Sequence, residues 1–135
     1  MKKYSIALFL TMAAATAYAG ETKVSLTGAE ETPAVTTNAS GAGTITVGSG
    51  AEHAVSGSIT TKDVQATAAH IHQAAAGKSG PPVITLAKTG DNTWSVPAGA
   101  TLNDEQYASY LAGNLYINVH SADHRPGEIR GQLRP

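Results

Sequence analysis

Short alternations of apolar and polar residues recur along most of the chain after residue 20. Val, Ile and Thr are frequent in these runs, and clusters of Gly, Asn, Ser and Pro separate them. Side chains of an extended chain point alternately to two faces, so this period of two predicts short β-strands with one buried face. The predicted strands lie near residues 23–28, 43–47, 53–60, 64–73, 83–87, 93–96, 114–120 and 127–134.

Short strands in this number, with turn signals between them, predict an all-β domain. The expected architecture is an antiparallel Greek-key β-sandwich, with a closed barrel as the alternative. No internal repeat, low-complexity tail or linker interrupts the pattern. We therefore expect one domain.

One segment departs from the alternation. Asn103 can cap a helix, and Gln106, three residues later, can reach back to it in a capping box. Apolar positions then follow at helical spacing, and Gly113 suits the end of a helix. The pattern predicts one short helix within residues 103–112.

The first nineteen residues have the pattern of a secretory signal. A short basic start precedes an apolar run, and Ala17-Tyr18-Ala19 forms a small-x-small cleavage site. The apolar run is too short to span a membrane, and no longer one follows it. The sequence predicts a signal peptide over 1–19, a domain over 20–135, and export to the periplasm or the medium.

Composition narrows the chemistry of the predicted domain. Residues 20–135 contain seven basic and ten acidic residues, which disfavours nucleic acid and anionic membrane surfaces as partners. This segment has neither cysteine nor methionine, so thiolate and thioether ligands are excluded. All five histidines of the chain remain as candidates for chemistry.

Face assignment divides these histidines. His70 and His72 lie on one side of a predicted strand, about 6.5–7 Å apart along it, while Ile71 points to the other side. His120 lies on the polar side of the strand near 114–120, together with Asn118. His53 belongs to another strand and stands apart.

Imidazoles from separate strands can converge on one metal ion. We expect His70, His72 and His120 to be ligands, with His124 or Asp123 as a possible fourth. Imidazole suits Cu(II) and Zn(II), so copper or zinc is the expected ion. The alternative is that these rings only hydrogen-bond loops or face water.

Other charged residues are assigned supporting roles. Glu128 and Arg130 share the outward face of the last strand, and we expect an ion pair that positions the loop 120–125. Asn118 or Glu128 could orient the imidazoles. Glu30 and Glu31 are adjacent and would face opposite ways on a strand, which argues against a pair of catalytic carboxylates.

The chain resembles the CHRD domain family, which was named from repeats in chordin and also occurs singly in secreted bacterial proteins. The similarity spans about residues 24–133. Three blocks carry it: LTGAEETPAV (26–35) with Gly41, AHIH (69–72) with GPPV (80–83), and LAGNLYINVH (111–120) followed by PGEIRGQL (126–133). The resemblance implies a β-rich extracellular domain. It also places His70, His72, His120, Glu128 and Arg130, but not His124, at motif positions.

The His-x-His strand is also similar to the copper-ligand strand of copper–zinc superoxide dismutases, which like immunoglobulin domains are Greek-key sandwiches. Three hypotheses follow. The first is a non-enzymatic exported protein that binds copper or zinc. The second is an extracellular module that binds a protein or envelope component, in which the imidazole nitrogens of His70 and His120 would lie more than about 6 Å apart. The third is a redox enzyme of dismutase type.

Overall fold

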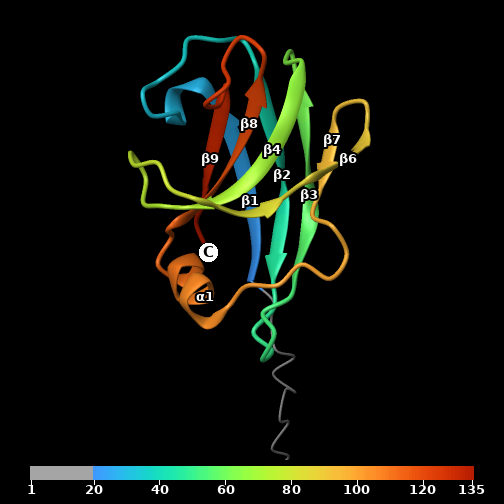
Figure 1. The fold of residues 1–135 in the computed structure, drawn as a ribbon, viewed down its shortest axis with the longest axis vertical. Coiled ribbons are helices and arrows are strands. Elements are labelled where there is room, and N and C mark those ends of the chain that lie inside the picture. Colours follow the sequence, from blue (N-terminus) through green and yellow to red (C-terminus); the bar gives the residue numbers. More distant parts are fainter. Residues whose placement is uncertain (1–19) are drawn as a thin grey trace, which may run out of the picture.

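The computed structural model describes residues 20–135, and the signal predicted over 1–19 lies outside them. Strands and one α-helix follow in this order: β1 (Gly20–Thr27), the 3₁₀ turn η1 (Gly28–Glu30), β2 (Ser40–Val47), β3 (Val55–Lys62), β4 (Ala66–Gln73), β5 (Pro82–Thr85), β6 (Ala87–Gly90), β7 (Thr93–Ser95), α1 (Asp104–Leu111), β8 (Leu115–Ser121) and β9 (Ile129–Leu133). This confirms the predicted all-β class with one short helix (Figure 1). Among the described residues, no helix is long and apolar enough to cross a membrane.

The strands of residues 20–135 form a single antiparallel sheet. Its order is β5-β4-β8-β9-β1-β2-β3-β7-β6. Within it, β1, β2 and β3 are consecutive neighbours, and β9 returns by a long connection to pair with β1, which is the Greek-key arrangement. Only Leu86 separates β5 from β6, although these strands form opposite edges of the sheet. The sheet must therefore curl until its two edges meet, which gives a form between a sandwich and a barrel.

The inner face of the curled sheet holds the core. Alternate residues of the strands point inward, as the period of two predicts, and the core also receives Trp94, Leu102 and Tyr110. The most deeply buried aliphatic side chains are Leu26, Ile45, Val47, Ile59, Ile71, Leu115, Ile117, Val119, Ile129 and Leu133. Burial of this apolar face supplies the main driving force for folding.

The predicted strands agree with the structure to within about three residues at their ends, and two of the differences have a local cause. The strand expected over 53–60 begins at Val55, because His53 adopts a left-handed conformation with φ of 47° and ends the preceding turn. The strand expected over 83–87 divides into β5 and β6. No pattern predicted β6, because all four of its residues are exposed and alternation has no inward side to mark.

The helix α1 begins as the sequence predicts. Asn103 Oδ1 accepts a hydrogen bond from the backbone N–H of Gln106 at 2.8 Å, and Gln106 Oε1 accepts one from the backbone N–H of Asn103 at 2.9 Å. Tyr110 anchors the helix to the sheet, since its hydroxyl donates to the carbonyl of Gly20 and lies 2.7 Å from Thr22 Oγ1. The helix thereby lies at the end of the sheet opposite the loop that follows β1 (Figure 1).

Removal of the helix cap should weaken the fold measurably. Asn103→Ala leaves the N–H of Gln106 without its acceptor, and we expect a loss of about 1 kcal/mol in the free energy of unfolding. Urea denaturation followed by far-ultraviolet circular dichroism measures this loss. Asn38→Ala, at an exposed loop position, is the matched control. Equal stability of the two variants would contradict the assigned role of the cap.

Candidate metal centre

The register of three neighbouring strands gathers the polar side chains. β4, β8 and β9 lie side by side (Figure 1), and three rows of paired residues cross one face of them. These rows are Ala68–His120, His70–Asn118–Arg130 and His72–Tyr116–Gln132. Asn118 is therefore at the centre of the group, directly opposite both His70 and Arg130.

This polar face is covered, which corrects the prediction that the side chains of the last strand point outward to solvent. Asn118, Arg130 and Gln132 are 3%, 2% and 7% exposed. Three loop segments cover this face, at residues 37, 74–80 and 126. Each makes hydrogen bonds to these side chains or to the neighbouring Glu128. Loops carry no hydrophobic period, so the alternation of the strands could not show that a second layer lies over them.

The expected ion pair between Glu128 and Arg130 does not form in the described part of the chain. The guanidinium of Arg130 donates to the carbonyls of Lys78 at 2.7 Å and Ala75 at 3.1 Å. It also stacks 3.5 Å from the centre of the Tyr116 ring. Backbone carbonyls replace the carboxylate because the loop over the sheet brings them within reach of the planar donor group.

Glu128 instead accepts two hydroxyl hydrogen bonds. Thr37 and Ser121 each donate to its carboxylate at 2.8 Å. Ser121 Oγ in turn accepts from the backbone N–H of His124 at 3.1 Å. Glu128 thus holds the loop after β8, as expected, but through Ser121 rather than through Arg130.

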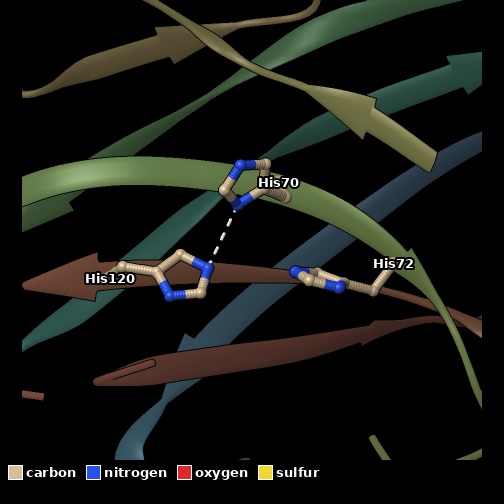
Figure 2. Close-up of side chains that lie close together, drawn as sticks. All are labelled: His70, His72 and His120. Carbon is tan, nitrogen blue, oxygen red and sulfur yellow. Dashed lines mark hydrogen bonds between the residues drawn. The ribbon is translucent and has the colours of Figure 1, made fainter. Parts of the chain in front are cut away.

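The three predicted histidines converge. His70 Nδ1 lies 3.1 Å from His120 Nε2, and one nitrogen from each of His70, His72 and His120 lies within 4.8 Å of the others. Figure 2 shows the His72 ring directed edge-on toward the other two, which come from β4 and β8. The strand pairing creates this convergence, since His70 and His72 share a face and His120 approaches diagonally.

Backbone carbonyls determine which nitrogen of two rings is available. His72 Nδ1 donates to the carbonyl of Gly80 at 2.9 Å, and His120 Nδ1 donates to that of Arg125 at 2.7 Å. A neutral imidazole carries one N–H, so the Nε2 atom of each ring has a free lone pair. His72 Nε2 is buried and has no hydrogen-bond partner among the described residues. Its ring also stacks on Tyr116, with centroids 4.9 Å apart.

Burial keeps two of these rings neutral. Desolvation lowers the pKa of His70, and the nearby charges of His120 and His72 lower it further. Desolvation also lowers the pKa of His72, against the opposing effect of the Gly80 carbonyl. At neutral pH the lone pairs of these rings are therefore not taken up by protons.

The other candidate ligands lie elsewhere. His124 lines a cavity of about 480 Å³, and Asp123 lines a separate one of about 240 Å³. Neither belongs to the group of converging histidines. His53 also lies apart, stacked on Tyr107 with centroids 3.9 Å apart and with Nε2 3.0 Å from Asp104 Oδ1.

The sequence reasoning missed the importance of Glu31. This residue lies in the loop after η1, lines the larger cavity with His124, and has one buried carboxylate oxygen without a partner. Burial raises the pKa of Glu31 to about 7, although Arg130 and the Asn118 side chain oppose the shift. Glu31 lies within residues 26–35, one of the three blocks that carry the resemblance to the CHRD domain family. That position was the signal in the sequence that could have pointed to it.

Glu31→Gln should stabilise the protein at high pH. Folding raises the pKa of Glu31 from 4.5 to about 7, so its contribution to stability is complete below pH 4.5 and is lost as the pH rises through 7. We expect the variant to gain about 1 kcal/mol over the wild type between pH 5 and pH 8, less than the full shift implies because solvent screens this half-buried group. Thermal unfolding at both pH values measures it. Glu30→Gln, at the exposed neighbour, is the control, and its difference in stability from the wild type should be the same at pH 5 and pH 8. A difference for Glu31→Gln that is also independent of pH would contradict the raised pKa of Glu31.

Comparison with known proteins identifies the family. The family model described as CHRD domain matches residues 22–133, which is nearly the whole described part of the chain. None of the curated proteins and none of the solved structures matches the chain. The converging histidines and the buried Asn118, Glu128 and Arg130 all lie within the matched segment. The chain therefore belongs to the CHRD domain family.

Proposed function

We propose that this protein binds a divalent transition metal, copper or zinc, through His70, His72 and His120. The observation that carries the proposal is their convergence. Three imidazoles from two strands each direct one nitrogen to a common region, and these atoms lie within 4.8 Å of one another.

The distances suit a small ion. Nitrogen ligands lie about 2.0–2.1 Å from zinc, so two of them at a tetrahedral angle are roughly 3.4 Å apart. His70 Nδ1 and His120 Nε2 are 3.1 Å apart, close to this value. A structural motif without a metal would predict rings that do not converge, which is the opposite arrangement.

One proton must move when the ion enters. His120 already donates through Nδ1 to Arg125, so in the metal-free protein His70 Nδ1 supplies the hydrogen in the contact between the two rings. Transfer of this hydrogen to His70 Nε2 frees the Nδ1 lone pair. With the hydrogen on Nε2, His70 Nδ1 and His120 Nε2 would both present lone pairs to a bound ion.

The donor set selects the class of metal. Residues 20–135 contain no sulfur ligand, and neutral imidazoles favour Zn(II) and Cu(II) over soft ions. Gly80 and Arg125 provide the outer hydrogen bonds that orient His72 and His120. Together with the signal predicted over 1–19, this supports an exported metal-binding protein.

Titration of the metal-free protein tests the proposal directly. We expect one equivalent of Zn(II) or Cu(II) to bind the wild type, and the double variant His70→Ala, His72→Ala to bind at least about 100-fold more weakly, since two ligands are lost. Isothermal titration calorimetry measures both affinities. His53→Ala and His124→Ala remove imidazoles outside the cluster and should retain the wild-type affinity. Equal affinity of the double variant and the wild type would refute the proposal.

The affinity should withstand mild acid. A proton competes with the ion for each ligand nitrogen, and the pKa values of His70 and His72 lie below the usual 6.5, so competition at these rings begins only below that pH. We expect little change in Kd between pH 7.5 and 6.5, and a loss of about tenfold or more between pH 6.5 and 5. Competition titrations with a chelating dye across this range measure Kd. A steep loss that is already complete at pH 6.5 would contradict the assigned ligands.

A further inference from the structure

Two buried acceptor atoms near the histidines lack donors. Asn118 Oδ1 and His72 Nε2 are both buried without a hydrogen-bond partner among the described residues. Each unpaired buried polar atom of this kind costs free energy, and native proteins contain few of them. Two unpaired acceptor atoms on one face of the sheet therefore indicate a bound ligand that would interact with both of them.

The chemistry of the neighbours establishes that both atoms are acceptors. Asn118 Nδ2 donates to the carbonyl of Pro126 at 3.1 Å, so the amide cannot be turned over without placing two oxygens against each other. Likewise, His72 Nδ1 must carry the ring hydrogen because it faces the carbonyl of Gly80. Neither group can supply a hydrogen to the other while the ring is neutral.

The two atoms belong to the same site. Asn118 pairs with His70 across the strands and lies between Tyr116 and His120 on the same face of β8. Its amide nitrogen donates to the carbonyl of Pro126, in one of the loops that cover the sheet. The oxygen of the amide is therefore on the side of the histidines, and the nitrogen is on the side of the covering loops.

We propose that Asn118 Oδ1 is the fourth ligand of the metal site, beside His70, His72 and His120. This inference rests on the proposed metal binding. An amide oxygen is a neutral donor of the weak kind that completes some imidazole-rich copper sites, and an ion between Asn118 Oδ1 and His72 Nε2 would satisfy both lone pairs. The resulting set of three nitrogens and one oxygen supplies the four ligands that zinc prefers, without His124 or Asp123.

Variants of Asn118 distinguish coordination of the ion by Oδ1 from a purely structural role of the hydrogen bond to Pro126. Asn118→Ala removes the oxygen, and we expect Zn(II) to bind at least about tenfold more weakly. Asn118→Asp retains an oxygen at the same reach and should recover most of the affinity, whereas a role confined to the Pro126 hydrogen bond would be lost in both variants. His124→Ala should match the wild type in the same calorimetric titrations.

A measurement on the wild type covers the case in which a variant does not fold. The ¹³Cγ and ¹⁵Nδ2 resonances of Asn118 are recorded by nuclear magnetic resonance before and after one equivalent of Zn(II). Coordination through Oδ1 withdraws electrons from the amide, so we expect both resonances to shift more than those of Asn103, an amide outside the site.

The outcomes distinguish the two proposals. Asn118 is not a ligand if Asn118→Ala binds Zn(II) as the wild type does and the wild-type Asn118 resonances shift no more than those of Asn103. In that case the loss of binding in the double histidine variant still supports the metal site. If the wild type binds neither Zn(II) nor Cu(II), both proposals fail together.

Discussion

The buried guanidinium of Arg130 is the constraint on which the arrangement of the polar face depends. A charge at 2% exposure without a carboxylate partner is unfavourable unless strong acceptors surround it, and here the carbonyls of Ala75 and Lys78 serve that purpose. By fixing these carbonyls, Arg130 holds the loop after β4 against the sheet. That loop brings Gly80 to His72, so the tautomer of this ring depends on a cation elsewhere on the same face.

Several titratable groups near Arg130 favour their uncharged forms. Arg130 is the permanent charge, and burial favours the uncharged forms of Glu31, His70 and His72 around it. Asn118 lies between the loops and the histidines: its nitrogen donates to Pro126 in a covering loop, and on the sheet it pairs with His70. The site is thus built from neutral donors in a setting that already contains one positive charge, which disfavours protons and leaves lone pairs free.

Alternation along single strands was sufficient to predict the converging histidines, because it places His70 and His72 on one face and needs only one partner strand to bring His120 near. It could not predict the register that makes Asn118 central, since pairing between β4 and β8 depends on contacts across 50 residues of sequence. It also could not show that Arg130 is buried, because the covering loops have no period. Nothing in the pattern connected Glu31 with the histidines, because alternation does not encode the path of the loop after η1.

The single residue between β5 and β6 has a consequence for behaviour at high concentration. Open sheet edges offer unpaired N–H and C=O groups to other molecules, and proteins limit this by covering, shortening or interrupting them. Here the curl brings the two edges together at Leu86, whose N–H donates to the carbonyl of Ala69, and Pro82 removes a donor from β5. Strand addition from a second molecule therefore finds short and interrupted edges, which favours contact through side-chain surfaces over pairing of backbones.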